Sequence, residues 1–241
     1  MNKIEIKIKY IVNWLKDYLV ESKMDGFVFG ISGGIDSALL AYILAKHFPN
    51  NSLAYIMNIE NSKQDIDNAL LVAKSSKIKY AEIDIETTYF NIKNILPNDI
   101  TILGNVKSRL RMITLYAFAQ NNNMLVLGTS NADEYYTGYF TKYGDSGSDL
   151  LPLVNLTKSD IYSAAKYFNI PNEILIKKPS AGLYEGQTDE EELNVSYNDI
   201  DNFLLKLNVS KDKNEIIKKL HKNSKHKRIL PMSPKKKGIL L

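Results

Sequence analysis

The sequence predicts an α/β fold in which a doubly wound, mainly parallel sheet carries helices on both faces. Two observations support this prediction. Short, continuous apolar runs alternate along the first half of the chain with segments of helical apolar spacing, and a glycine-rich turn joins the first run to the segment after it. Strands buried on both faces have this continuous apolar character, because crossover helices between parallel strands cover both sides of the sheet.

The first half of the chain supplies the alternating elements. Residues 7–22 place apolar side chains three or four positions apart, which predicts an amphipathic helix. Residues 27–31 are a short apolar run, which predicts the first strand. In chain order, the elements expected next are a helix over 38–48, a strand over 53–59, a helix over 65–75, a strand over 78–85, a helix over 105–120 and a strand over 124–127.

The second half is more polar. Residues 129–149 form a stretch rich in Gly and Tyr that is too long for an ordinary connection, and such segments are usually functional or disordered. Capping-box spacings predict two helix starts farther on. The expected elements are a helix from Thr157 (with Asp160), a loop over 179–187, a helical region from Thr188 (with Glu191) to about residue 207, and a basic helix over 215–221.

Composition bounds the class of protein. The chain has 241 residues, 44% of them hydrophobic and 24% charged, so we expect a single globular domain over 1–241. No apolar run approaches the ~18 residues needed to span a bilayer, and the N-terminus lacks a signal-peptide stretch, which predicts a cytoplasmic protein without membrane contact. The absence of cysteine excludes disulfides, thiolate metal sites and a thiol nucleophile.

Positive charge is concentrated in a basic C-terminal tail, residues 211–241. The whole chain has a formal net charge of +4, whereas this tail contains eleven Lys or Arg residues against two acidic ones. Such tails are often only solvated, and nucleic-acid binding is not expected here because no aromatic-rich basic strand accompanies the tail. An anionic small molecule is the better candidate ligand.

The glycine turn is the segment from Gly30 to Ser37, which reads Gly-Ile-Ser-Gly-Gly-Ile-Asp-Ser. It is not a Walker A loop, because an Asp stands where the Lys is required, and its glycine spacing does not fit a dinucleotide-binding fingerprint. Two serine hydroxyls, the N–H groups of Gly33 and Gly34, and the N-terminus of the following helix instead form a cradle for an anion.

Asp36 lies within the glycine turn. A carboxylate next to a bound polyphosphate is repulsive unless a divalent cation stands between them, and Mg²⁺ is commonly held by one or two carboxylates with phosphate oxygens. The alternative is that Asp36 only caps the helix. The combination of Ser-Gly-Gly-x-Asp-Ser with a preceding apolar strand favours a polyphosphate site with Mg²⁺.

The glycine turn resembles the pyrophosphate loop of the N-type ATP pyrophosphatases, which split ATP into AMP and pyrophosphate to adenylate an oxygen of the substrate. From about residue 10 to residue 228, the chain resembles the ammonia-dependent NAD synthetases, which implies an adenine nucleotide alpha hydrolase-like fold. The segments that carry this second resemblance are 105–112, 128–134, 137–145, 150–153 with 156–158, 178–183 and 226–228.

This resemblance implies roles for the matching residues. Asp36 and Glu134 would hold Mg²⁺, and Lys158 would supply the positive charge that the glycine turn lacks, so these three are the expected catalytic residues. The implied ATP-binding residues are Gly30, Ile31, Ser32, Gly33, Gly34, Ile35, Asp36, Ser37, Thr129, Lys158 and Ser180. The implied deamido-NAD-binding residues are Arg109, Lys142, Asp149, His226 and Lys227.

Departures from the family pattern leave two questions open. Many bacterial relatives have Asp-His-Ala-Ala-Glu where this chain has Ser-Asn-Ala-Asp-Glu over 130–134, so Asp133 competes with Glu134 for the metal, and register favours Glu134. The tyrosines at 135, 136 and 139 could stack on a base or pack within the protein. Ser180 stands where many relatives have Thr, and either hydroxyl can donate to a phosphate.

The implied reaction joins ATP, deamido-NAD and ammonia in two steps. The carboxylate of deamido-NAD attacks the α-phosphorus of ATP and releases pyrophosphate, and ammonia then displaces AMP from the acyl adenylate to give NAD. Free ammonia is the expected donor, because the chain has neither the length for a glutaminase domain nor its cysteine nucleophile. A lid over 180–187 is also expected, and the family implies a homodimer with the dinucleotide site at the subunit interface.

Two other functions stay open at this point. One is an enzyme that adenylates a different substrate, such as a lysidine-forming tRNA ligase, which would need a tRNA-binding extension. Only the basic tail is a candidate for such an extension. The other is a non-catalytic adenine-nucleotide-binding module of related fold, which would have no need of Asp36 and Glu134.

Overall fold

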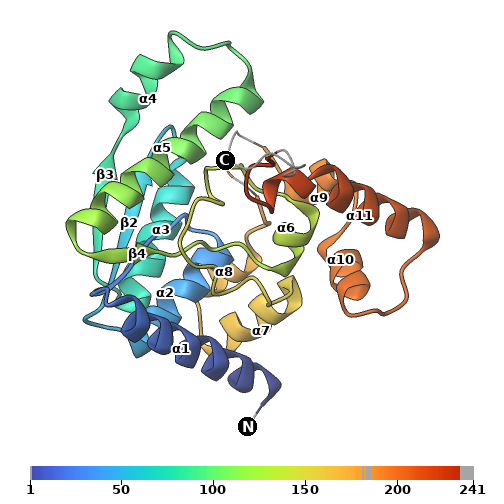
Figure 1. Ribbon diagram of the computed structural model, residues 1–241, viewed down its shortest axis with the longest axis horizontal. Helices are drawn as coiled ribbons and strands as arrows, with labels where there is room; N and C mark the ends of the chain where they lie inside the picture. The colour runs from blue at the N-terminus through green and yellow to red at the C-terminus, as the bar shows by residue number, and fades with distance from the viewer. Residues whose placement is uncertain (1, 181, 183–185, 234–241) are drawn as a thin grey trace, which may run out of the picture.

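A four-stranded parallel sheet forms the centre of the computed structural model, which describes residues 2–180, 182 and 186–233 (Figure 1). Its strands are β1 (Gly26–Gly30), β2 (Ser52–Asn58), β3 (Tyr80–Asp84) and β4 (Met124–Val126), in the order β3-β2-β1-β4. The chain moves outward from β1 to β3 and then crosses back to the other side of β1, where β4 pairs with it. The carboxyl ends of β1 and β4 therefore form the topological switch point, where open α/β sheets bind ligands.

Helices cover both faces of the sheet, as the sequence predicts (Figure 1). Successive residues of β1 point to opposite faces, and Phe27, Val28 and Phe29 are all fully buried. Phe27 and Phe29 pack in the larger apolar cluster, whereas Val28 packs in a smaller cluster against α5 (Ile100–Asn121). The helices of the larger cluster are α1 (Lys3–Ser22), α2 (Ile35–His47), α3 (Lys63–Ser76), α7 (Lys158–Tyr167) and α8 (Asn172–Ile176).

Helix starts differ from the sequence predictions where a polar cap lies upstream of the apolar pattern. Helix α1 begins four residues earlier than expected, at Lys3, because Asn2 and Glu5 form a capping box. Helix α5 begins at Ile100, since Asp99 accepts hydrogen bonds from the first backbone N–H groups. A short helix that was not predicted, α4 (Glu86–Lys93), lies between β3 and α5.

The second half contains one helix that was expected to be loop. Helix α6 (Ala132–Thr137) is capped by Asn131 at its start, and Gly138 adopts a left-handed φ of 74° at its end. The capping box of Thr157 with Asp160 is confirmed at the start of α7.

The expected capping box of Thr188 with Glu191 is wrong, because Thr188 makes no cap hydrogen bond. The helical region is divided into α9 (Asp189–Leu193) and α10 (Tyr197–Leu204). Asn194 ends the first helix with a left-handed φ of 56°, and Ser196 starts the second with a capping box of its own.

The basic tail begins with α11 (Lys211–Asn223) and a 3-10 turn over Lys225–Lys227, and residues 234–241 lie outside the described residues. Helices α10 and α11 form a third apolar cluster at the end of the molecule away from β3 (Figure 1). Tyr136 and Tyr139 pack against this cluster, and the Tyr136 ring stacks on His221 with 4.0 Å between ring centroids. Among the described residues, no helix is long and apolar enough to cross a membrane.

Candidate active site

The glycine turn connects β1 to α2 in a tightly determined conformation. Gly33 has a left-handed φ of 76°, and a Cβ there would lie 2.8 Å from the backbone oxygen of Asp65. Ser37 Oγ accepts a hydrogen bond from the Ser32 backbone N–H at 3.2 Å and donates one to the Gly34 oxygen at 3.0 Å. The turn is therefore held by its own hydrogen bonds and packs closely against α3.

The start of α2 has no side-chain cap. Gly34 is the N-cap residue, and no side chain among the described residues caps the first turn of the helix. Asp36 does not cap α2. The alternative that this residue serves only as a helix cap is therefore excluded. Because the uncapped N–H groups and the helix dipole both favour negative charge, the start of α2 is suited to an anion.

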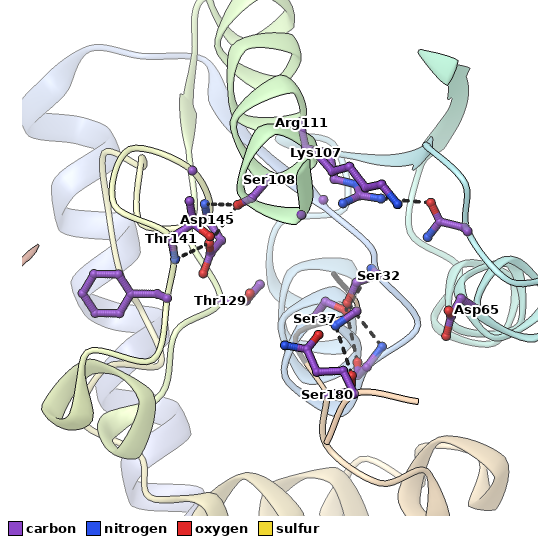
Figure 2. Close-up of a pocket in the computed structure, with 18 of the residues that line it drawn as sticks. Ser32, Ser37, Asp65, Lys107, Ser108, Arg111, Thr129, Thr141, Asp145 and Ser180 are labelled. Atoms are coloured by element: carbon purple, nitrogen blue, oxygen red, sulfur yellow. Dashed lines mark hydrogen bonds between the residues drawn. The ribbon is translucent and has the colours of Figure 1, made fainter. Parts of the chain in front are cut away.

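A cleft of about 1400 Å³ opens at the carboxyl ends of the strands. Ser32, Ser37 and Ser180 lie close together in it, and Thr129 lies opposite (Figure 2). The predicted site residues that line the cleft are Gly30, Ile31, Ser32, Gly34, Ile35, Asp36, Ser37, Thr129, Glu134, Lys158, Ser180 and Lys227. All of the predicted ATP-binding residues except Gly33 therefore share one cavity.

Lys158 brings the predicted catalytic residues together. Its Nζ atom lies 2.7 Å from Asp36 Oδ2 and 3.4 Å from Glu134 Oε1, and its side chain is 4% exposed. The same ammonium lies 4.7 Å from the centre of the Tyr197 ring, which adds a cation–π contact. The three residues come from the starts of α2, α6 and α7, so one cation neutralises two carboxylates from different helices.

The two carboxylates crowd one another. Burial and the nearby charge of Asp36 raise the pKa of Glu134 well above its usual range. Among the described residues, no group of three or more His, Asp or Glu side chains has the arrangement of a metal site. Two carboxyl groups that face a phosphate cradle nevertheless match the donors with which Mg²⁺ is held beside a polyphosphate.

Asp133 and Glu134 point in different directions. Glu134 lines the cleft, whereas Asp133 is fully buried, and its Oδ2 accepts a hydrogen bond from the Lys158 backbone N–H at 2.9 Å. Burial, a hydrogen bond with Asp201 and the charge of Asp201 raise the pKa of Asp133 to about 9. Glu134 is thus the carboxylate that faces the cleft.

Four of the predicted deamido-NAD residues do not line the cleft of this chain. Arg109 is exposed on α5, and its Nε and Nη2 donate to the backbone oxygen of Lys142 at 3.3 and 3.2 Å. Asp149 is occupied by structural bonds, since it accepts from the Tyr116 hydroxyl at 3.1 Å and the Val126 N–H at 2.7 Å. His226 is exposed.

Lys227 does line the cleft, where it binds main-chain oxygens. Its Nζ donates to the carbonyls of Gly138 at 2.8 Å and Phe140 at 2.7 Å. Arg228 donates to the carbonyl of Tyr136 at 3.1 Å. The start of the basic tail is therefore fastened to the segment that follows α6.

Helix α5 contributes cleft residues that sequence reasoning missed. Arg111 Nη2 donates to Asn61 Oδ1 at 2.9 Å, and Ser108 Oγ donates to Asp145 Oδ1 at 2.8 Å (Figure 2). Ser108 and Arg111 are three residues apart and lie on one helix face, whereas Arg109 falls on another. Helical spacing within the matching segment 105–112 could have separated the inward Arg from the outward one.

The expected lid is only partly described. Residues 181 and 183–185 of the segment 180–187 lie outside the described residues. The two ends of the loop meet where the Asp189 backbone N–H donates to the Pro179 oxygen at 3.3 Å. Lys177 Nζ also pairs with Asp65 Oδ1 at 2.6 Å, which ties the approach to this segment to the start of α3. The lid itself stays a prediction.

Comparison with known proteins finds relatives along the whole chain. The sequence profile of the NAD synthase family matches residues 7–237. The NH3-dependent NAD(+) synthetase of Malacoplasma penetrans is 48% identical, with 100% of both chains covered. That of Alkaliphilus oremlandii is 43% identical, with 96% of this chain and 98% of the relative covered.

Solved structures also match this chain over nearly its whole length. The NMN synthetase from Francisella tularensis has a TM-score of 0.90 and 42% identity, covering 97% of this chain and 99% of its own. The NH3-dependent NAD synthetase from Campylobacter jejuni has a TM-score of 0.81 and 27% identity, covering 98% of this chain and 100% of its own.

Proposed function

Because the chain belongs to the NAD synthase family, whose ligases amidate deamido-NAD with ammonia at the expense of ATP, we propose that the cleft at the β1–β4 switch point performs this reaction. The observation that carries the proposal is the contact of Lys158 with both Asp36 and Glu134 beside the glycine turn. If Lys158 served only to stabilise the fold, one carboxylate partner would be enough. A second carboxylate beside the glycine turn instead indicates a functional site.

ATP binds, in this proposal, with its phosphates against the glycine turn. The N–H groups of the turn and of the start of α2 donate to phosphate oxygens, and Gly34 lets the backbone approach closely. Lys158 neutralises the departing pyrophosphate. Thr129 supplies a hydroxyl donor from the opposite side of the cleft, and Ser180 supplies one from the first position of the expected lid.

Asp36 and Glu134 would hold Mg²⁺, which would neutralise phosphate charge when bound. This fit is supported by the raised pKa of Glu134, whose physical cause is burial beside the Asp36 carboxylate. Asp36 already has both oxygens engaged, by the Asn131 amide at 2.9 Å and by Lys158 at 2.7 Å. The carboxylate is thereby held in place, and Lys158 can turn from it toward a phosphate.

The protein acts by orientation and charge rather than by a covalent step. The carboxylate of deamido-NAD attacks the α-phosphorus in line with the leaving pyrophosphate, and ammonia then attacks the adenylated carbonyl and expels AMP. The glycine turn and Lys158 hold the leaving pyrophosphate, which stabilises the charge that develops on it. Asp145 presents a further carboxylate to the cleft, fixed by Ser108 and the Thr141 N–H.

Deamido-NAD binding is proposed to need a second copy of the chain. Arg109 is exposed on α5, and Lys142, whose backbone oxygen accepts a hydrogen bond from it, also lies outside the cleft of its own subunit. A homodimer that brings these two residues over the partner's cleft would complete the site, as the family resemblance implies. Asp149, His226 and Lys227 keep their proposed roles at this site, and Lys227 is the one that lines the cleft of its own chain. We also propose that the protein is cytoplasmic.

The decisive experiment mixes the protein with ATP, Mg²⁺, deamido-NAD and ammonium. Equimolar NAD, AMP and pyrophosphate are expected over many turnovers. All three products should disappear without ATP or deamido-NAD, whereas omission of ammonium should abolish NAD and stop sustained turnover after adenylate formation. Pyrophosphate release without deamido-NAD, or release that tRNA rather than deamido-NAD stimulates, would contradict the proposal.

The acceptor can be tested in the same assay. One similar structure is that of an NMN synthetase, so nicotinic acid mononucleotide should be compared with deamido-NAD as the acceptor. We expect the dinucleotide to have the higher kcat/KM, in line with the NAD synthetases that are 43% and 48% identical. A preference for the mononucleotide would keep the site and chemistry but change the substrate.

A further inference from the structure

We propose that Asn131 is a positioning residue that holds Asp36 in register with Glu134, and that its side-chain amide, rather than its capping oxygen, carries this role. The inference rests on the proposed metal-binding roles of the two carboxylates. Asn131 is 0% exposed, and it sits at the N-cap of α6, three residues before Glu134.

Each end of the Asn131 side chain has a different task. Oδ1 accepts hydrogen bonds from the backbone N–H groups of Asp133 at 3.1 Å and Glu134 at 3.0 Å, which caps α6. Nδ2 donates to Asp36 Oδ1 at 2.9 Å. The Glu134 carboxylate in turn accepts from the Asn131 backbone N–H at 3.3 Å, so all three residues belong to one network.

An amide suits both tasks at this position. The other common N-cap residues, Ser, Thr and Asp, offer the oxygen that a helix start needs. An ionised Asp has no donor, and a Ser or Thr hydroxyl must accept and donate through one oxygen, whereas Asn accepts and donates through two separate atoms. The amide is uncharged, so it fixes Asp36 without neutralising the charge that a cation would require.

The network fixes both oxygens of Asp36 from different directions. Oδ1 is bound by the Asn131 amide, and Oδ2 is bound by Lys158 Nζ at 2.7 Å. When Lys158 turns toward a phosphate, Asn131 is the described residue that still holds the carboxylate. Loss of such a supporting bond typically costs about 10- to 100-fold in metal affinity or activity.

The test is Asn131→Ser, which keeps the helix cap and removes the amide donor. Asn2→Ser is the matched control, because Asn2 also caps a helix in a capping box but is exposed and distant from the cleft. The first readout is Mn²⁺ affinity, measured by electron paramagnetic resonance with an ATP analogue whose α–β bridge is methylene. The second is the split between kcat and the KM for deamido-NAD.

Asn131→Ser is expected to weaken Mn²⁺ binding by about 10-fold or more and to lower kcat by about 10- to 100-fold. The KM for deamido-NAD should stay near wild type, and Asn2→Ser should change neither quantity. Wild-type Mn²⁺ affinity and kcat in a folded Asn131→Ser protein would overturn the proposal. So would a loss of kcat with unchanged Mn²⁺ affinity.

A second variant, Asn131→Asp, preserves both cap and volume but places an acceptor where Asp36 Oδ1 now receives a donor at 2.9 Å. It is expected to lower kcat at least as much as Asn131→Ser, and wild-type turnover in a folded Asn131→Asp protein would also overturn the inference. Failure of the proposed function itself is distinguishable, because wild-type protein would then bind no Mn²⁺ with the analogue and form no NAD.

Discussion

The carboxyl groups of Asp133 and Asp201 converge on a single backbone N–H group, that of Lys158. Asp133 Oδ2 accepts at 2.9 Å and Asp201 Oδ1 at 3.1 Å, and both residues are buried. Lys158 is the first residue of α7, where the helix dipole disfavours a cation. The two carboxyl groups offset this cost and fix the helix start, so the ammonium reaches Asp36 and Glu134 from an anchored backbone.

The buried pair predicts a pH-dependent stability. Burial and Asp201 raise the pKa of Asp133 to about 9, whereas an unfolded aspartate ionises near pH 4, so between these values the folded state binds more protons. Folding is therefore weakened as pH rises, by up to about 1.4 kcal/mol per pH unit from this group. Asp133→Asn offers Asp201 an N–H donor that does not titrate.

Urea denaturation between pH 6 and pH 9 checks this expectation. The unfolding free energy of wild-type protein should fall more steeply over this range than that of Asp133→Asn. Asp17→Asn, on the exposed face of α1, is the control and should follow wild type. Parallel curves for wild type and Asp133→Asn would mean that Asp133 does not hold a proton in the folded protein.

The basic tail packs against Gly138 so closely that a side chain there is not expected to fit. A Cβ at Gly138 would lie 2.1 Å from Ser224 Cβ, and its φ is 74°. Gly138→Ala is therefore expected to destabilise the protein by about 1–3 kcal/mol through strain and to release the tail. Thermal unfolding and limited proteolysis after residue 224 are the measurements.

Gly182→Ala is the control that separates backbone strain from the steric clash of a new Cβ with the tail. Gly182 has a similar left-handed φ of 62°, but nothing lies within 4 Å of a Cβ there. Gly182→Ala should leave the tail as resistant to protease as in wild type. Equal release of the tail in both variants would remove the steric explanation.

Local motifs account for the parts of the site that sequence alone predicts. The glycine turn and Asp36 lie within eight consecutive residues, so adjacent residues are enough to predict them. The role of Lys158 is expected from the family resemblance, and only the helix start beside it, the capping Thr157, is a local signal. The parallel sheet is predicted for the same reason, because apolar runs and helical spacing are local signals.

What sequence reasoning missed depends on contacts between distant segments. Asp201 reaches Lys158 from 43 positions away, and Asn131 reaches Asp36 from 95 positions away. Neither pairing has a periodic signature. Helix α6 is only six residues long, so caps rather than an apolar stripe define it. The split between α9 and α10 depends on the left-handed Asn194, and Asn at this position is a helix C-terminal signal that sequence reasoning did not use.

Removing the Lys158 ammonium is expected to change both the turnover of the enzyme and the stability of the folded protein. Lys158→Met leaves Asp36 and Glu134 partly buried without their shared cation, which should lower turnover by about 10²- to 10³-fold. The same change should make the protein less stable, and added Mg²⁺ should raise its melting temperature more than that of wild type. Lys166→Met, on the exposed side of α7, is the control and should change neither property. Equal Mg²⁺ effects on Lys158→Met and wild type would argue against a metal held by these two carboxylates.

Arg109 predicts that two subunits share one site. Its guanidinium lies on the outside of α5 and donates to the Lys142 oxygen, whereas Asp36 lines the cleft of its own chain. If Arg109 serves the partner's cleft, then Asp36→Asn and Arg109→Met each inactivate a homodimer by damaging a different subunit's contribution.

Mixing these two inactive proteins, with reversible dissociation, should therefore restore activity. Half of the randomly formed dimers would be mixed, and each would contain one intact site of two, giving about a quarter of wild-type activity. Mixing Asp36→Asn with Glu134→Gln should restore none, because both changes damage the same side of the site. Sedimentation must show dimers in every sample, and a mixture of Asp36→Asn and Arg109→Met that stays inactive would mean that Arg109 does not act across the interface.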